Sequence, residues 1–406
     1  MDVISQPSRA ALVGALLVIV ALLAPGAAHA ATYAPCELSL ADHDPPGRTS
    51  AYDLTVAKRR TTCATARKVM RAFHRCRTES WYRCPRKVLG AWRCTGRKRA
   101  TTLANTYRGS FTCRRGIARV RSGYLQNTPR CFGAAARDPL LRCFSRTRTL
   151  SPGPGVPDPD MNWVCDPGAI PGACTFGVAE HEARGRFAII GDSHVEHWRT
   201  AFSAVIMAER WRGYSISVGG CFFSAAVGGF QPGCVSFYNQ ALRWLRDHPE
   251  VDTVFVTQNA DTPVGGTSAQ ENRRLRVEGF KRAYRALPRT VKHLVVLRDT
   301  TISTHATLGC AISAARSRSR RLAPVCPLSR ATAIREDHAI QAVEELNSER
   351  YAQIDLTRYL CSRRSCYPIV GGTLVNGDVW GHLNNTFSRT LGPYLLRELR
   401  RLRAAW

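Results

Sequence analysis

From residue 185 onward, short apolar segments alternate with longer amphipathic ones, and this alternation limits the folds that are open to the chain. The apolar segments predict strands over Phe187–Ile190, Tyr214–Val218, Val251–Thr257, His293–Leu297 and Ala352–Leu356. The remaining segments predict helices near 194–210, 236–247, 270–286, 328–346 and 385–404. Short apolar strands that alternate with helices favour a parallel sheet covered on both faces. We therefore expect an α/β fold with about five parallel strands and a site beyond their carboxyl ends.

The first thirty residues have the layout of a secretory signal peptide. Arg9 precedes an apolar run over 10–23, and Ala28-His29-Ala30 then offers small residues at both cleavage positions. We therefore expect residues 1–30 to direct export, so that the protein is secreted or associated with the cell envelope; an uncleaved membrane anchor is the alternative. No later run of about 18 apolar residues exists, so we expect that the mature protein does not span a membrane.

All sixteen cysteines follow the predicted signal peptide. An even number of cysteines in an oxidising compartment favours up to eight disulfides. No pair has the C-x-x-C spacing of zinc sites, so we expect no metal and no other cofactor. From residue 131 onward, neighbours along the chain are the candidate pairs: Cys131–Cys143, Cys165–Cys174, Cys221–Cys234, Cys310–Cys326 and Cys361–Cys366. The six earlier cysteines allow fifteen connectivities, and the sequence does not choose among them.

Positive charge is concentrated in residues 31–128, which carry 21 Lys and Arg against 5 Asp and Glu. Residues 129–406 carry 36 against 24, and the shift predicts a domain boundary near residue 128. In the first segment we expect a small disulfide-rich α+β module. Its helix would run from Thr61 or Thr62 to about Arg77, and two strands would flank the Arg115-Gly116 turn.

Two interpretations of this basic module stay open. It could bind an anionic envelope polymer, with Trp81, Tyr82 and Trp92 adding aromatic contacts. Alternatively, its arginines form a solvated surface without a dedicated ligand. Because we expect export, an envelope polymer is favoured over nucleic acid as the partner.

One strand leads directly into a candidate nucleophile. The apolar residues end at Gly191-Asp192-Ser193, and a helical pattern begins at once. This placement puts the Ser193 hydroxyl at the carboxyl edge of the sheet and its backbone N–H at the positive end of a helix, where it can bind an oxyanion. Gly191 permits the tight turn. The alternative is that Asp192 or Ser193 only caps the helix.

A carboxylate and a histidine stand together in the loop before the last predicted helix. Asp378 precedes His382 by four residues, and in a turn such a carboxylate can fix the tautomer of the imidazole. A serine hydroxyl needs a base to become a nucleophile, so His382 is the candidate base for Ser193. The alternative is an ordinary surface histidine.

Gly-Asp-Ser-His after a strand, with Asp…His-Leu before a C-terminal helix, resembles the SGNH (GDSL-like) hydrolase superfamily. The resemblance is greatest to the SGNH domain that is fused to acyltransferase-3 membrane proteins; no membrane segment of that kind is visible here. The matching segments are 131–136, 190–198, 296–300, 354–357, 382–383 and 387–391. The resemblance implies a three-layer, flavodoxin-like SGNH domain over residues 129–406.

The resemblance also implies serine-based acyl transfer. Ser193 would attack an ester carbonyl, His382 would accept its proton, and Asp378 would orient His382. The family's Asp usually lies three residues before the His, so the extra residue here could leave His382 on a backbone carbonyl instead.

For the oxyanion hole, the superfamily adds a glycine and an asparagine to the serine N–H. Gly220 is preferred over Gly219 because it adjoins the predicted Cys221 disulfide. Asn259 lies just past the third strand, although not in the superfamily's Gly-x-Asn-Asp context.

The expected function is therefore an exported serine acyl-esterase or O-acyltransferase that acts on O-acyl groups, O-acetyl in particular, of cell-surface glycans. Its substrate would be an acylated glycan or another ester, and a separately encoded membrane protein could donate the acyl group. The alternative is a non-catalytic protein that binds polyanions or glycans on a degenerate SGNH scaffold.

Overall fold

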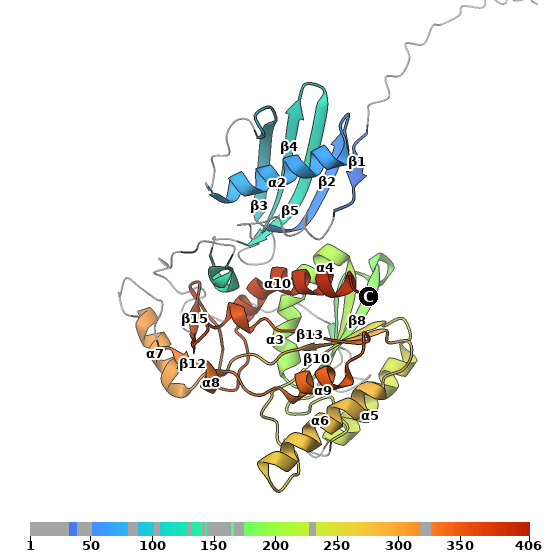
Figure 1. Ribbon diagram of the computed structural model, residues 1–406, viewed down its shortest axis with the longest axis vertical. Coiled ribbons are helices and arrows are strands. Elements are labelled where there is room, and N and C mark those ends of the chain that lie inside the picture. The colour runs from blue at the N-terminus through green and yellow to red at the C-terminus, as the bar shows by residue number, and fades with distance from the viewer. Residues whose placement is uncertain are drawn as a thin grey trace, which may run out of the picture. The chain divides into compact units, whose positions relative to one another are not determined.

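The structure, a computed structural model, describes residues 32–38, 51–79, 88–100, 106–127, 131–139, 143, 164–165, 174–226, 233–316 and 326–406. The predicted signal peptide lies outside the described residues. The described residues form two large sheets (Figure 1), an antiparallel one within residues 34–127 and a mostly parallel one within residues 164–354, and two small two-stranded sheets. The predicted domain boundary near residue 128 stays a prediction.

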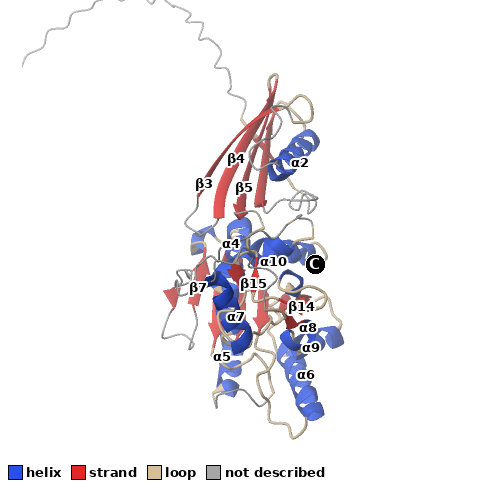
Figure 2. Cartoon of the chain, turned by 90° about the vertical axis from the view of Figure 1, so that its left-hand side faces the viewer, coloured by secondary structure: helices blue, strands red, loops and turns tan. Residues whose placement is uncertain are grey.

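The basic module is a five-stranded antiparallel sheet with one helix on one face (Figure 2). Its strands, in the spatial order β1-β2-β5-β4-β3, are β1 (Ala34–Cys36), β2 (Ala51–Arg59), β5 (Ala118–Asn127), β4 (Thr106–Arg115) and β3 (Arg93–Ala100). Helix α2 (Cys63–Glu79) begins after Thr62, whose hydroxyl accepts the Thr65 N–H at 3.1 Å. The expected α+β character is confirmed.

The core of this module lies between α2 and the sheet. Val69 and Phe73 of α2 pack against Phe111 of β4 and Val120 of β5. Trp92 also belongs to this core, with 3% of its surface exposed, so the expectation that it contacts a polymer is wrong. Trp81 and Tyr82 lie outside the described residues. Disulfides Cys36–Cys63 and Cys94–Cys113 cross-link the module.

The larger sheet has seven strands, and five of them are parallel. In spatial order they are β13 (Tyr351–Ile354), β11 (His293–Leu297), β10 (Thr253–Thr257), β8 (Gly185–Gly191), β9 (Trp211–Ser217), β7 (Cys174–Gly177) and β6 (Val164–Cys165). The five from β13 to β9 are parallel, whereas β7 and β6 extend the edge in antiparallel fashion. Numbered along the chain, the parallel strands have the flavodoxin-like order 2-1-3-4-5, which confirms the expected fold class.

Helices cover both faces of this sheet because neighbouring strand residues point to opposite sides. Phe187 and Ile189 of β8 pack on one side, with α3 (His194–Ala201), α4 (Ser203–Glu209) and α10 (Asn385–Arg403). Ala188 and Ile190 pack on the other, with α5 (Cys234–Asp247), α6 (Ala269–Arg285) and α9 (His338–Leu346). The result is three layers, with the sheet in the middle. No helix of the described residues is long and apolar enough to cross a bilayer.

The helix expected over 328–346 is wrong. Helix α8 (Arg330–Ala333) ends at Ile334, which is extended, and the Asp337 side chain then caps α9 by accepting the Ala339 N–H at 3.1 Å. Helix α7 (His305–Arg316) was not expected. The shorter elements are η1 (Gly133–Arg137), η2 (Glu180–Glu182), η3 (Thr357–Tyr359), β12 (Leu328–Ser329), β14 (Ser365–Cys366), β15 (Ile369–Val370) and β16 (Thr373–Leu374).

Disulfides also cross-link loops of the α/β part. The structure contains four of the candidate pairs: Cys131–Cys143, Cys221–Cys234, Cys310–Cys326 and Cys361–Cys366. In the fifth candidate pair, Cys165 stands opposite Cys174 in the β6–β7 register, but the Cys165 side chain lies outside the described residues. These bonds indicate an extracytoplasmic location, since cytosolic reductants keep most thiols reduced.

Candidate active site

Gly191 and Asp192 shape the turn between β8 and the candidate nucleophile. Gly191 pairs with Thr257 of β10, and a Cβ on Gly191 would lie 1.8 Å from the Thr257 carbonyl oxygen, so the close approach requires glycine. Asp192 is buried, and its carboxylate accepts the His194 N–H at 2.9 Å and the Asn259 N–H at 2.7 Å. Asp192 therefore caps the helix that begins at His194, as one interpretation of the sequence expected, and it also links the loop after β8 to the loop after β10.

Ser193 makes no side-chain capping hydrogen bond; its hydroxyl faces His382 instead. The Ser193 Oγ lies 2.7 Å from His382 Nε2, across 189 positions of sequence. The other ring nitrogen, Nδ1, lies 2.6 Å from an Asp378 carboxylate oxygen. The structure thus brings together the three side chains that the sequence marked as serine, base and orienting carboxylate.

The loop accommodates the extra residue between Asp378 and His382 without turning the carboxylate away. The second Asp378 oxygen accepts the N–H groups of Trp380 at 2.9 Å and His382 at 3.2 Å. Gly381 adopts a φ of 95°, a left-handed conformation that suits glycine, and reverses the chain just before His382. His382 is therefore held by the carboxylate rather than by a backbone carbonyl.

Asp378 is ionised at neutral pH. Burial alone would raise its pKa, but the hydrogen bond and charge of His382, together with the Trp380 and His382 N–H groups, outweigh burial and lower the pKa. A carboxylate on Nδ1 holds that proton in place, so Nε2 of a neutral His382 faces Ser193 as an acceptor.

The two further oxyanion-hole candidates follow the neighbouring strands. Gly220 lies in a turn after β9 that the Cys221 N–H closes onto the Val218 carbonyl at 3.0 Å, and its φ is 72°. Asn259 follows β10, and its side-chain amide donates to the Trp380 carbonyl over a long 3.4 Å. Because β9, β8 and β10 are adjacent parallel strands, these residues share one sheet edge with Ser193, at the point where the strand order reverses.

A comparison with known protein families identifies the family of the α/β part. The family model described as "SGNH domain (fused to AT3 domains)" matches residues 159–397. The chain belongs to this SGNH family. The family match supports an esterase or acyltransferase in general terms.

One solved structure found in the comparison is the periplasmic domain of a lipopolysaccharide acetyltransferase from Salmonella ser. Paratyphi A. It is 14% identical, with a TM-score of 0.40, and the alignment covers 55% of this chain and 90% of that chain. No match was found among curated protein sequences.

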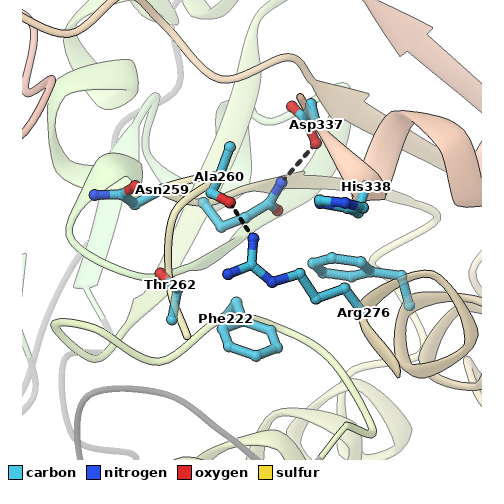
Figure 3. A pocket seen from close by; sticks show the side chains of 9 residues that line it. Phe222, Asn259, Ala260, Thr262, Arg276, Asp337 and His338 are labelled. Carbon is cyan, nitrogen blue, oxygen red and sulfur yellow. Dashed lines mark hydrogen bonds between the residues drawn. The ribbon is translucent and has the colours of Figure 1, made fainter. Parts of the chain in front are cut away.

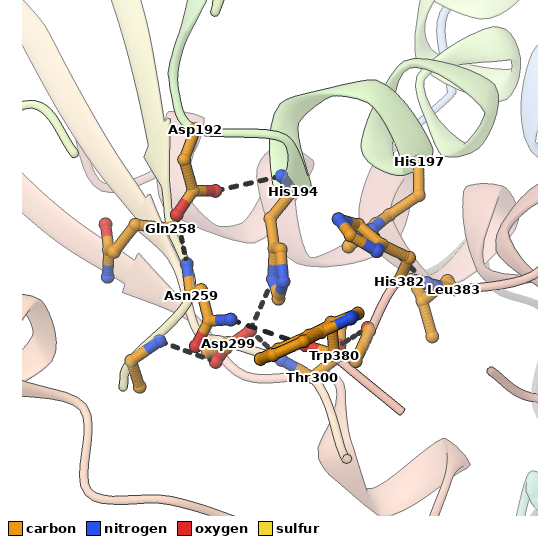
Figure 4. A network of polar contacts seen from close by, with 12 residues as sticks. Asp192, His194, His197, Gln258, Asn259, Asp299, Thr300, Trp380, His382 and Leu383 are labelled. Carbon is orange, nitrogen blue, oxygen red and sulfur yellow. Dashed lines mark hydrogen bonds and ion pairs between the residues drawn. The ribbon is translucent and has the colours of Figure 1, made fainter. Parts of the chain in front are cut away.

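The SGNH site rests on a buried polar network that the sequence did not reveal (Figure 4). Asp299, directly beyond the end of β11, binds His194 Nδ1 at 2.8 Å and accepts the Ala260 N–H at 2.8 Å. Burial alone would lower the pKa of His194, but the charge and hydrogen bond of Asp299 outweigh it and raise the pKa to about 9. Asp299 thus joins the loop that carries Ser193 to the loop that carries Asn259.

The same loop after β11 also anchors the loop that carries His382. The Thr300 hydroxyl donates to the Gly381 carbonyl at 2.8 Å, and the Asn376 amide donates to the Thr301 carbonyl at 2.7 Å. From the other side, the Leu383 N–H donates to Nδ1 of His197 on α3 at 3.2 Å. A sequence pattern could not identify these contacts, because each joins segments far apart in the chain.

Two further histidine rings lie close to the candidate base. The rings of His194 and His197 lie 5.0 Å and 6.2 Å from that of His382. Burial, together with the charges of His194 and His382, holds the pKa of His197 well below its usual range, so His197 is neutral. Within the described ranges, no group of three or more His, Cys, Asp or Glu side chains is placed to hold a metal ion.

A small pocket is lined by Asn259 and contains no part of the serine–histidine pair (Figure 3). Arg276 reaches across it to the Ala260 carbonyl, and Gln258 donates to Asp337 at 3.2 Å. The enclosed space is about 10 Å³, close to the room for one water molecule and too small for an acyl group.

Proposed function

We propose that the protein is an exported serine esterase or O-acyltransferase of the SGNH type, with Ser193 as its nucleophile. The observation that carries this proposal is the 2.7 Å contact between Ser193 Oγ and His382 Nε2, with Asp378 on the opposite ring nitrogen. A degenerate binding scaffold would have no need to keep this chain of three groups aligned, so the contact favours catalysis over the non-catalytic alternative.

The chemistry proceeds in two half-reactions. Ser193 Oγ attacks the acyl carbonyl while His382 Nε2 takes its proton, and Asp378 stabilises the imidazolium that forms. The tetrahedral intermediate collapses, the C–O bond to the sugar breaks, and His382 returns the proton to the leaving hydroxyl. Water or a second hydroxyl, deprotonated by His382, then attacks the acyl-serine. The bond from the acyl carbon to Ser193 Oγ breaks, His382 returns the proton to Oγ, and the acyl group leaves on the attacking oxygen.

Negative charge on the carbonyl oxygen develops where the strand ends offer donors. We assign the oxyanion hole to the backbone N–H groups of Ser193 and Gly220 and the side-chain amide of Asn259. The long contact from Asn259 to the Trp380 carbonyl is weak enough to be exchanged for a bond to the oxyanion. Loss of one such donor typically costs about 100- to 1,000-fold in rate.

Trp380 is the proposed contact for the sugar that carries the acyl group. It lies two residues before His382, and 63% of its surface is exposed although it is large and apolar. Its backbone N–H donates to Asp378, and its backbone carbonyl accepts from Asn259. These bonds hold the loop in place and leave the indole ring available for contact with a substrate. The C–H-rich face of a pyranose is a natural partner for such a ring. The proposed substrates are O-acylated, in particular O-acetylated, glycans of the cell surface.

Hydrolysis and transfer pass through the same acyl-serine intermediate. They differ only in whether water or a sugar hydroxyl attacks that intermediate. In a transferase, a separately encoded membrane protein would supply the acyl group to Ser193, and a glycan hydroxyl would receive it. Adding an acceptor glycan to the purified protein distinguishes the two, because a transferase forms acyl-glycan at the expense of free acid.

The first test is hydrolysis of p-nitrophenyl acetate by the wild type, Ser193→Ala and Ser236→Ala. Ser236 is an exposed serine of α5 and serves as the matched control. We expect Ser193→Ala to lose about 10⁴-fold or more in kcat and Ser236→Ala to match the wild type. Equal rates for the wild type and Ser193→Ala would overturn the proposal.

A further inference from the structure

One face of the basic module's sheet is unusually rich in arginine. Helix α2 covers the opposite face, where the core residues Leu54, Val56 and Phe111 point (Figure 2). The alternate positions point outward. Eight of these are arginines, which we call the arginine face: Arg59, Arg93, Arg97, Arg99, Arg108, Arg114, Arg119 and Arg121. Arg59 and Arg119 are half-buried, and the other six are exposed.

The strand register places four of these arginines in one row. Arg93 of β3 is opposite Arg114 of β4, Arg114 is opposite Arg119 of β5, and Arg119 is opposite Arg59 of β2. A second pair, Arg99 and Arg108, is also directly opposed. Like charges directly opposite each other destabilise a sheet. The row therefore lowers the stability of the fold, and the core together with disulfides Cys36–Cys63 and Cys94–Cys113 offsets this loss.

No carboxylate relieves this repulsion within the described residues. The outward positions of the face whose side chains are described contain Thr, Ser, Ala, Gly and Pro besides arginine, and no Asp or Glu. Arg119 is held by the Gly116 and Ala118 carbonyls, and Arg121 stacks over the Tyr33 ring at 4.7 Å. These contacts orient the guanidinium groups but leave their charge unneutralised, so the face is complementary to a polyanion.

We infer that the arginine face binds an acidic polysaccharide, with carboxylates of successive sugars on arginines of successive strands. Neighbouring strands lie about 4.8 Å apart, close to the length of one sugar unit in an extended polymer. The planar guanidinium binds carboxylates through two parallel hydrogen bonds. A polysaccharide is favoured over nucleic acid because the disulfides Cys36–Cys63 and Cys94–Cys113 belong to an oxidising compartment. The inference does not depend on the ester chemistry.

The test compares two triple variants of the full chain that carry the same net charge. Arg93→Gln, Arg97→Gln and Arg114→Gln remove three exposed arginines of the arginine face. The control removes three exposed arginines of α5 and α6: Arg243→Gln, Arg274→Gln and Arg285→Gln. Binding to polygalacturonate, neutral dextran and single-stranded DNA is measured over a range of NaCl concentrations.

We expect the wild type to bind polygalacturonate and not dextran, and to bind it more tightly than DNA of equal charge. The arginine-face variant should bind it at least tenfold more weakly, with the slope of log K against log salt reduced in magnitude by about 2 to 3. It should unfold at the same or a higher temperature, because repulsion has been removed. The control should stay within about twofold of the wild type.

Three results would overturn the inference. Equal losses in the two triple variants would mean that binding follows net charge rather than this face. Absence of polygalacturonate binding by the wild type would remove the proposed ligand. Tighter binding to DNA would identify nucleic acid as the partner. Ester hydrolysis by the arginine-face variant is expected to be unchanged, so failure here and failure of the proposed function are separable.

Discussion

The two sheets of this protein place charge in opposite ways. In the basic module, arginines stand in register on an open face and have no carboxylate among the described residues to pair with. In the SGNH domain, Asp192, Asp299 and Asp337 are at most 5% exposed, and each accepts at least two backbone N–H groups. Exposed, unneutralised charge is available to a ligand, whereas buried, saturated charge holds loops in position. The difference separates the proposed binding surface from the scaffold of the proposed active site.

The largest effect on stability is expected for Asp299→Asn, which removes one of these buried charges. His194 has a pKa of about 9 in the folded protein, whereas an unfolded chain has about 6.5. Its pairing therefore contributes on the order of 3 kcal/mol below pH 6.5, and this stability is lost as pH rises through about 9. We expect the variant to be strongly destabilised at pH 6 and to lack this decline.

Thermal unfolding between pH 6 and pH 10 measures both effects. Asp247→Asn, at an exposed carboxylate near the end of α5, is the control and should follow the wild type. A wild-type decline that survives in Asp299→Asn would contradict the assigned role of the His194–Asp299 pair.

Removing one disulfide from each region separates structure from catalysis. Cys221–Cys234 ties the Gly220 turn to α5, whereas Cys94–Cys113 cross-links β3 and β4 of the module. Either double Cys→Ser change is expected to cost about 2–4 kcal/mol of stability in its own region. Only the Cys221 and Cys234 change should also lower kcat for p-nitrophenyl acetate, by about 10- to 100-fold, because an oxyanion donor is loosened. Equal kcat in both variants would argue against Gly220 as a donor.

The smallest expected effect belongs to Trp380, the exposed side chain in the loop that carries His382. Trp380→Ala should raise KM for an acetylated oligosaccharide about tenfold, which corresponds to about 1.4 kcal/mol of sugar contact. With ethyl acetate, which has no sugar, the variant should match the wild type. A loss that is equal for both esters would assign Trp380 to loop structure instead of substrate binding.

The repeated unit of the α/β domain could be predicted from the sequence because its central strands β8, β10 and β11 each contain a run of at least three consecutive apolar residues. Strand β11 has the predicted bounds, His293–Leu297. Its last four residues are apolar and buried, and His293 pairs with Thr253 of β10. Strand β3 escaped prediction because it reads Arg-Cys-Thr-Gly-Arg-Lys-Arg-Ala, with arginines outward and Gly96 under Phe111 and Phe73. Prediction of a strand depends on large apolar residues that alternate with polar ones. That alternation is missing from a segment in which arginines alternate with residues such as Cys94 and Gly96.

The same limit applies to the site. Ser193 and His382 could be identified because each belongs to a pattern within a single segment. Ser193 follows the end of a strand, and His382 lies in a turn with Asp378. The pairing of His194 with Asp299 depends on which strands are neighbours, since β11 and β8 flank β10. No sequence pattern favours this pairing over a helix cap or an ion pair with Arg298 as the role of Asp299. In the structure Arg298 contacts Asp355 instead.

The most direct test of the account is covalent labelling of Ser193. The wild type, Ser193→Ala and Asp378→Asn would each be treated with a fluorophosphonate, which reacts with activated serines, and analysed by intact and peptide mass spectrometry. We predict one adduct per wild-type chain, on the peptide that contains Ser193, much slower labelling of Asp378→Asn, and none of Ser193→Ala. An unlabelled wild type, or equal labelling of the wild type and Ser193→Ala, would contradict the claim that His382 and Asp378 activate this serine.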